Sequence, residues 1–159
     1  PSSARLDELM VRQDVVPLQQ RTTVLADLRD STTDADSFEA VVSAAASVVV
    51  RAAADQDRVR LVTSDAGDAG MGGSHHHVEA LLEHLAVVGP LPAERWDATV
   101  ARLARSREGG TLVVLTAGGD DPLRLEAIGS RYERIVVVRV GDRPFPDAWA
   151  SALDAVVPG

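Results

Sequence analysis

The sequence predicts an α/β fold: a doubly wound, mostly parallel sheet with helices on both faces. Short apolar runs alternate with segments of helical periodicity along the chain, which is the pattern of parallel strands joined by helices. Residues 111–117 form a continuous apolar run, typical of a strand that is buried on both faces. No internal repeat and no long linker divides the 159 residues. We therefore predict one domain over residues 1–159, with its core in residues 21–159.

The first strand and the first helix are predicted from residues 22–54. Residues 22–27 read TTVLAD, a buried strand that ends on a polar stretch. From Phe38 the apolar residues recur at helical spacing, and residues 34–37 offer several helix N-caps. The valines at 48–50 alone would suit a strand, but the surrounding alanines favour helix.

The middle of the chain predicts a second strand and two more helices. Residues 58–63 alternate polar and apolar side chains, as a strand does, and the glycine-rich residues 64–74 predict a flexible loop. A helical pattern spans residues 75–88 and stops at Gly89 and Pro90, and Pro92 starts a third helix.

The last part of the chain predicts two more strands, each followed by a helix. The strands are expected at residues 111–117 and 134–140, and the helices at 122–130 and 146–157. Residues 1–20 are expected to form an edge segment, because proline suits an edge strand better than a central one. The chain opens at Pro1, which predicts a fragment of a longer chain.

Composition argues against several classes of function. The chain has 16 basic and 24 acidic residues and a net charge of −8, so we expect it to repel nucleic acid and anionic membrane. It has no cysteine, which excludes disulfides, thiolate metal sites and a cysteine nucleophile. No uninterrupted apolar run is long enough to span a membrane, so no direct membrane contact is expected from these residues.

Three strings carry a family resemblance: LMVRQDVVPLQQRTTVLADLR, FEAVVSAAASVVVRAA and DRVRLVT. With their spacing and the order of elements, they resemble the von Willebrand factor A-like domain. More narrowly, residues 6–140 are similar to the carboxy-terminal region of the bacterial domain-of-unknown-function family fifty-eight. The resemblance implies a cytoplasmic domain, often preceded by membrane-spanning segments. It also implies an association with ATPases of the MoxR type and a role in assembling or maturing other proteins.

Domains of this kind often hold Mg²⁺ through Asp-x-Ser-x-Ser after the first strand, a later Thr and an Asp after the fourth strand. Here Asp27 and Ser31 match, and Ser74 falls near the expected Thr. Arg29 stands where the first Ser belongs, and Ala117 stands where the last Asp belongs. The pattern is thus broken, and we expect no resident metal.

Arg29 decides this expectation, because a guanidinium cannot ligate a cation. Two unit charges 4 Å apart interact by about 4 kcal/mol at an effective dielectric of 20, so Arg29 would repel Mg²⁺ strongly. We expect Arg29 either to point away or to replace the ion as a fixed counter-charge. A rearranged site using Asp30, Asp65 or Asp120 is the alternative that would still hold magnesium.

Other suggestive residues have simpler interpretations. His75, His76 and His77 could ligate a transition metal, but neighbouring histidines on one helix turn predict a solvated helix start. The glycine-rich loop lacks the lysine of a phosphate loop, and the chain contains no lysine at all. Asp120 and Asp121 could form a carboxylate pair, but Asp121 before a proline predicts a helix N-cap. Trp96 and Trp149 are expected in the core.

The sequence therefore predicts a protein-interaction module that is not an enzyme and has no cofactor. Two alternatives stay open: an adhesion-type module that needs a divalent cation, and a metal-dependent hydrolase built on Asp27, Asp30 and Asp120. The expected binding surface lies at the carboxyl ends of the strands and comprises Asp27, Arg29, Asp30, Ser31, Ser74 and Thr116.

Overall fold

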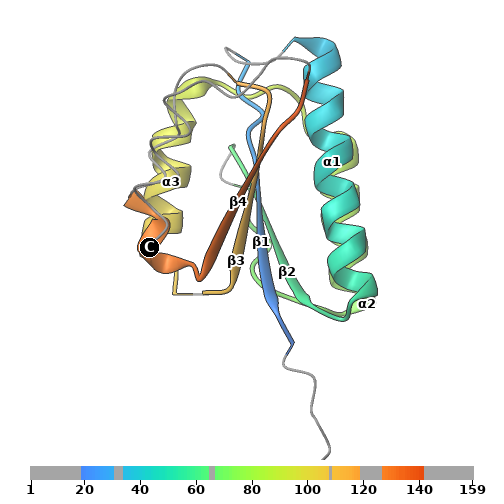
Figure 1. Ribbon diagram of the computed structural model, residues 1–159. Helices are drawn as coiled ribbons and strands as arrows, with labels where there is room; N and C mark the ends of the chain where they lie inside the picture. Colours follow the sequence, from blue (N-terminus) through green and yellow to red (C-terminus); the bar gives the residue numbers. More distant parts are fainter. Residues whose placement is uncertain (1–18, 31–33, 65–66, 108, 119–126, 142–159) are drawn as a thin grey trace, which may run out of the picture.

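The computed structural model describes residues 19–30, 34–64, 67–107, 109–118 and 127–141 (Figure 1). The order of elements confirms the predicted alternation of strands and helices as far as the third strand. It runs β1 (Arg21–Ala26), α1 (Ala35–Ala54), β2 (Arg58–Thr63), α2 (His75–Val87), a 3₁₀ turn η1 (Ala93–Arg95), α3 (Trp96–Arg105), β3 (Thr111–Thr116), a 3₁₀ turn η3 (Gly129–Arg131) and β4 (Arg134–Arg139). Of the helix predicted at 122–130, residues 122–126 lie outside the described residues, and Gly129–Arg131 form a 3₁₀ turn. The predicted edge segment before residue 19 and the closing helix at 146–157 lie outside the described residues.

The four strands form one sheet in the order β2-β1-β3-β4, and every pair is parallel. Ala26 of β1 pairs with Thr63 of β2 and with Leu115 of β3. The strands therefore end together, at the top of the sheet in Figure 1. This shared end is where a parallel α/β sheet offers a binding site.

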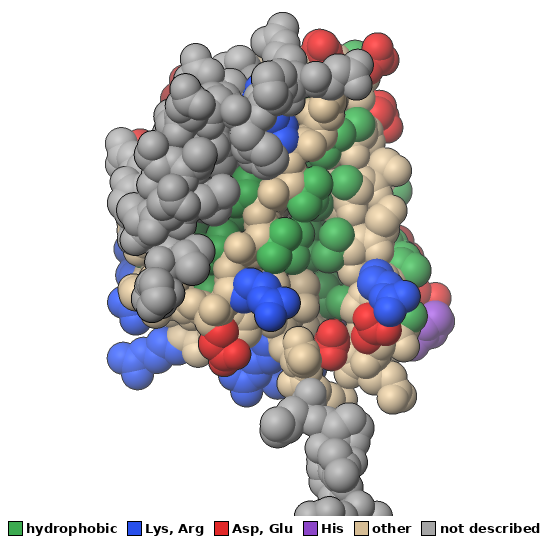
Figure 2. All heavy atoms as spheres, in the orientation of Figure 1, with side chains coloured by type: hydrophobic (Ala, Val, Ile, Leu, Met, Phe, Trp, Pro, Cys, Tyr) green, Lys and Arg blue, Asp and Glu red, His purple; other side chains and the backbone are tan. Residues whose placement is uncertain are grey.

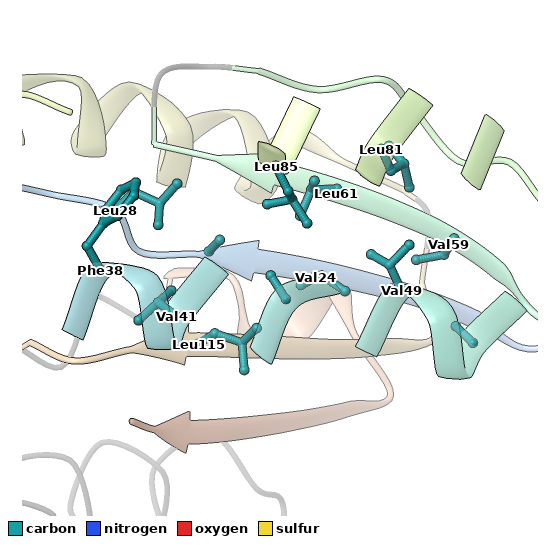
Figure 3. Close-up of a cluster of buried hydrophobic side chains, with 13 residues drawn as sticks. Val24, Leu28, Phe38, Val41, Val49, Val59, Leu61, Leu81, Leu85 and Leu115 are labelled. Carbon is teal, nitrogen blue, oxygen red and sulfur yellow. The ribbon is translucent and has the colours of Figure 1, made fainter. Parts of the chain in front are cut away.

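Helices cover both faces of the sheet, as the sequence predicts (Figure 1). On one face α1 and α2 pack over β1 and β2, and Figure 3 shows the side chains between them. The contact works because α1 buries a single stripe along its length: Phe38, Val41, Ala45, Val49 and Ala52. On the other face α3 buries Trp96, Val100 and Leu103 against Leu25, Leu112 and Val114.

The helix α1 is long and apolar enough, by length and composition, to cross a membrane, and the other described helices are not. Its buried stripe packs on the sheet, and core helices of soluble domains have the same composition. Asp34 starts α1 by accepting a hydrogen bond from the backbone N–H of Ser37 at 2.8 Å. A predicted N-cap thus sets the start of the helix.

The glycine-rich segment after β2 is the main correction to the predicted fold. It does not leave the sheet as a free loop, because it turns back along the outer edge of β2. Antiparallel bridges join Val62 to Asp68 and Val59 to Gly72. Since an exposed edge invites unwanted pairing, the segment 67–72 protects β2. The described part of the chain shows no equivalent cover on the outer edge of β4.

Candidate functional site

The candidate site begins at Asp27, the residue directly after β1. The backbone N–H of Asp27 still donates to the carbonyl of Leu115 at 2.9 Å, so this residue continues the sheet. Leu28 then donates its N–H to the Ser64 hydroxyl at 3.3 Å, at the end of β2. Because two neighbouring strands hold the backbone, the direction of the next side chain, Arg29, is fixed.

Arg29 turns back and forms a two-pronged ion pair with Asp27. Its Nε lies 2.8 Å from Asp27 Oδ1, and its second terminal nitrogen lies 2.9 Å from Oδ2. The guanidinium carbon sits 4.8 Å from the centre of the Trp96 ring, within the range of a cation–π contact. The Asp27 side chain is fully buried, and that of Arg29 is 8 % exposed.

Thr116, at the end of β3, completes the network. Its hydroxyl donates to Asp27 Oδ2 at 2.7 Å and accepts a hydrogen bond from the N–H of Gly118 at 2.9 Å. The backbone N–H of Arg29 also lies 3.4 Å from Asp27 Oδ1. Each oxygen of Asp27 therefore accepts from two donors of the chain itself. We call Asp27, Arg29 and Thr116, with the Trp96 ring, the internal brace.

This geometry distinguishes the two arrangements expected for Arg29. The side chain does not point away, because its guanidinium occupies the position of a counter-ion beside Asp27. A carboxylate that accepts hydrogen bonds at both oxygens has few lone pairs left for a metal or for a substrate proton. The brace therefore joins the carboxyl ends of β1 and β3.

Several exposed carboxylates lie near this end in the described part of the chain, beside the exposed Arg95. A parallel bridge links Arg29 to Leu91, and hydrogen bonds of 2.9 Å join Leu91 to Leu28 and to Asp30. This contact brings the turn before α3 beside the end of β1. Exposed carboxylates lie on the segments next to the brace, and Figure 2 shows acidic side chains at the top near the start of α1. We call them the acidic rim: Asp30, Asp34, Asp36 and Glu94.

The structure does not bring the whole expected binding surface together. Ser74 lies at the opposite end of β2, because the preceding residues pair back along that strand to Val59. There its hydroxyl accepts from the N–H of His77 at 3.1 Å and caps α2. Ser74 therefore cannot stand in for the expected Thr beside Asp27. Ser31, Asp65 and Asp120 lie outside the described residues.

Three of the four histidines of α2 have structural partners. His75 is exposed beside Glu79, with 3.1 Å between Nε2 and Oε1. His77 lies 2.9 Å from the carbonyl oxygen of Val59, and His84 lies 3.0 Å from the Thr63 hydroxyl. Within the described ranges no three His, Asp or Glu residues are grouped closely enough to hold a metal ion.

A second ion pair fixes the segment that covers β2. Arg60 holds Asp68 with two hydrogen bonds of 2.9 and 2.6 Å, and the Arg60 side chain is buried. Burial would raise the pKa of Asp68, but hydrogen bonds from Arg60 and Gly70, with the charges of Arg60 and Arg102, lower that pKa below its ordinary value of 3.8. Asp68 therefore stays ionised and holds the segment to β2 at neutral pH.

A shallow hollow of about 670 Å³ lies at the other end of the sheet. Its lining includes Arg21, Gly110 and Glu133, at the amino ends of the strands. None of the expected binding-surface residues that the structure describes lines it. The hollow is polar and open to solvent, so it lacks the enclosed apolar walls of a small-molecule site.

Three residues of the site were missed by reasoning from sequence. Ser64 directly follows β2, so its place at the carboxyl end of a strand could have singled it out. Trp96 was expected only in the core, and nothing local shows that its ring lies under a guanidinium. Leu91 contributes through its backbone, which leaves no signal in the sequence.

No protein-family model matches the chain, and no curated protein is significantly similar to it.

Proposed function

We propose that this chain is a non-catalytic protein-interaction domain that binds its partner at the carboxyl end of the sheet. The observation that carries the proposal is the internal brace, because its hydrogen bonds already use the Asp27 carboxylate that a metal site or a catalytic base would need. Asp27 would have to lose contacts to Arg29 and Thr116 before it could bind a metal or abstract a proton.

The brace favours direct recognition of a protein over recognition through an ion. Asp27, Arg29 and Thr116 are buried, so they position the surface and do not touch the partner. The acidic rim is exposed. Its carboxylates favour a basic partner surface and steer association over a distance of about 10 Å at 0.1 M salt.

The family resemblance gives a candidate partner. We propose that the chain is a von Willebrand A-like domain of the family-fifty-eight type. The partner would be a MoxR-type ATPase, and the domain would act on the cytoplasmic side of a membrane-anchored protein. Two observations support this proposal: the three sequence strings quoted above, and the α/β architecture with its all-parallel sheet.

The experiment measures binding of the purified domain to a purified MoxR-type ATPase by biolayer interferometry. The test variant reverses two rim charges, Asp30→Arg with Glu94→Arg. The matched control, Glu79→Arg with Glu83→Arg, makes the same change in net charge on the exposed side of α2.

We expect the rim variant to lose binding roughly tenfold or more, and the control to stay within about twofold, as surface charge pairs allow. Binding should weaken as salt is raised. No binding by the wild-type domain would reject the ATPase as the partner. Equal losses in both variants would move the binding surface away from the rim.

A further inference from the structure

The segment 67–72, which we call the cover of β2, is attached to the sheet by polar contacts. The N–H of Val59 donates to the carbonyl of Gly72 at 2.8 Å, and the N–H of Gly72 donates back at 3.1 Å. The N–H of Thr63 donates to the carbonyl of Gly67 at 3.1 Å. All residues of the cover are half-buried or exposed, and neither hydrophobic cluster of the described chain includes one of them. The stability of the cover therefore depends on hydrogen bonds and charge more than on apolar packing.

The side-chain contacts of the cover converge on Arg60. Its Nε and one terminal nitrogen donate to the two carboxylate oxygens of Asp68, at 2.9 and 2.6 Å. The other terminal nitrogen donates to the Ser106 hydroxyl at 2.7 Å, directly after α3. The Arg60 side chain is only 8 % exposed, so both contacts are largely shielded from water. One guanidinium thus joins β2, its cover and the end of α3.

The elements on either side of the cover are held independently of it. The strand β2 pairs with β1 along its whole length. The start of α2 is capped by Ser74, and His77 in its first turn lies 2.9 Å from the carbonyl oxygen of Val59. The cover contains three glycines, which gain more backbone freedom on release than other residues do. It can therefore leave the edge of β2 while β2 and α2 stay in place.

We propose that the cover of β2 opens as one unit while the rest of the domain stays folded, and that Arg60, positioned by Ser106, controls this opening. Asp68 holds the cover closed through the Arg60 guanidinium. Ser106 is a positioning residue, because it orients that guanidinium from α3. In the open state the outward N–H groups of Val59 and Thr63 face solvent, and β2 becomes an edge strand that can pair with another strand. The contact thus links the end of α3 to the accessibility of the β2 edge.

Native-state hydrogen exchange, followed by NMR at several urea concentrations, tests the proposal on the wild-type chain. Val59 and Thr63 direct their N–H groups to the cover, whereas the alternation of a strand directs those of Arg60 and Val62 to β1. We expect the first two amides to exchange roughly tenfold faster or more, after correction for intrinsic rates, and with little dependence on urea. Exchange of all four amides through global unfolding alone would overturn the proposal.

Two variants separate local opening from global unfolding, with circular dichroism to show that each is folded. Asp68→Asn should speed the exchange of the Val59 and Thr63 amides by roughly ten- to a hundredfold, because it weakens hydrogen bonds from a charged group. The control, Val41→Ala, shortens a fully buried side chain of α1 that stays packed when the cover opens. It should speed exchange at Arg60 and Val62 roughly tenfold or more and leave Val59 and Thr63 unchanged. Equal acceleration of all four amides by Val41→Ala would refute a separate opening of the cover.

Substitutions at Ser106 test its positioning role with the same amides. Ser106→Ala removes the hydroxyl that holds Arg60, so the Val59 and Thr63 amides should exchange roughly fivefold faster. Ser106→Thr keeps the hydroxyl and should retain the wild-type rates. Wild-type rates in Ser106→Ala, or equal acceleration in both variants, would overturn the role of Ser106.

Discussion

Removing the guanidinium of Arg29 should destabilise the fold far more than removing the guanidinium of an exposed arginine that also pairs with an aspartate. The proposed change is Arg29→Met, which keeps most of the length of the side chain. It leaves the fully buried Asp27 carboxyl group without its counter-charge, with the Thr116 hydroxyl and one backbone N–H as its remaining donors. Removing one partner of a buried ion pair costs about 3–5 kcal/mol, and the lost stacking on Trp96 adds about 1 kcal/mol.

A double-mutant cycle separates the ion pair from the packing. Asp27→Asn keeps an oxygen that can accept from Thr116 but removes the charge. The double variant should be less destabilised than the sum of the two single effects by roughly 2–3 kcal/mol. The reason is that each single variant leaves one partner of the buried pair without the other, whereas the double variant contains neither charged partner. The matched control is Arg51→Met. Arg51 pairs with Asp55 at the same 2.8 Å, but its side chain is 78 % exposed. That change should cost less than about 0.5 kcal/mol.

Urea unfolding followed by circular dichroism measures these free energies. With a slope near 2 kcal/mol per molar urea, a loss of 4 kcal/mol lowers the midpoint by about 2 M. A small domain has about 5–15 kcal/mol in total, so the Arg29→Met variant would lose a large part of it. A loss under about 1 kcal/mol, or a coupling near zero in the cycle, would show that the brace does not hold this end of the sheet.

Three further predictions concern the cover of β2, a close backbone contact and the metal. Asp68→Asn should cost roughly 1.5–3 kcal/mol at pH 7 in urea unfolding, because it weakens hydrogen bonds from Arg60 to a charged group. The folded pKa of Asp68 is lowered, so its contribution is present above the unfolded value of 3.8 and is lost as pH falls through the folded pKa. The difference in unfolding free energy between wild type and Asp68→Asn should therefore disappear below the folded pKa of Asp68. A difference that does not change with pH would contradict the charged Arg60–Asp68 contact. Gly110→Ala should unfold at a much lower temperature than Gly70→Ala. Both have positive φ, but only at position 110 would a Cβ overlap the backbone of β1, and equal melting temperatures would contradict this contact. Finally, isothermal calorimetry should show no heat of Mg²⁺ binding to the wild-type chain. The Arg29→Ser variant restores the hydroxyl of the adhesion pattern, and 10 mM Mg²⁺ should stabilise its fold by about 1.4 kcal/mol if the ion binds with a Kd near 1 mM. Micromolar Mg²⁺ binding by the wild-type chain would favour the adhesion-type alternative.

The central strands and α1 could be predicted from the sequence because their signal is local. The apolar run at β3 and the stripe of α1 each repeat with the period of the element itself. The boundaries came within a few residues, and the third helix begins with a 3₁₀ turn that the proline at position 92 does not distinguish from α-helix. Where the structure of a segment depends mainly on its own residues, composition and hydrophobic periodicity are enough to predict it.

The cover of β2 could not be predicted, because its structure depends on a partner elsewhere in the chain. Residues 67–72 contain three glycines, and glycine weakens a strand prediction. The segment pairs with β2 because Arg60, which points out of that strand, holds Asp68. The same limit applies to Ser74. Its expected place assumed that the loop stays at the carboxyl end of the sheet, whereas the return pairing carries it to the other end.

The two buried ion pairs show how this chain fixes its loops without a metal ion. Each pairs an arginine with an aspartate through two hydrogen bonds, and the chain has no lysine that could compete for the same role. The planar fork of arginine matches both oxygens of a carboxylate, so each pair fixes an orientation as well as a distance. A bound Mg²⁺ would fix the end of β1 only while the ion is present, but Arg29 is a permanent part of the chain. Within the acidic rim, the backbone of Asp30 is likewise held by its hydrogen bond to Leu91, so a partner that bound there, as proposed, would meet that residue already positioned.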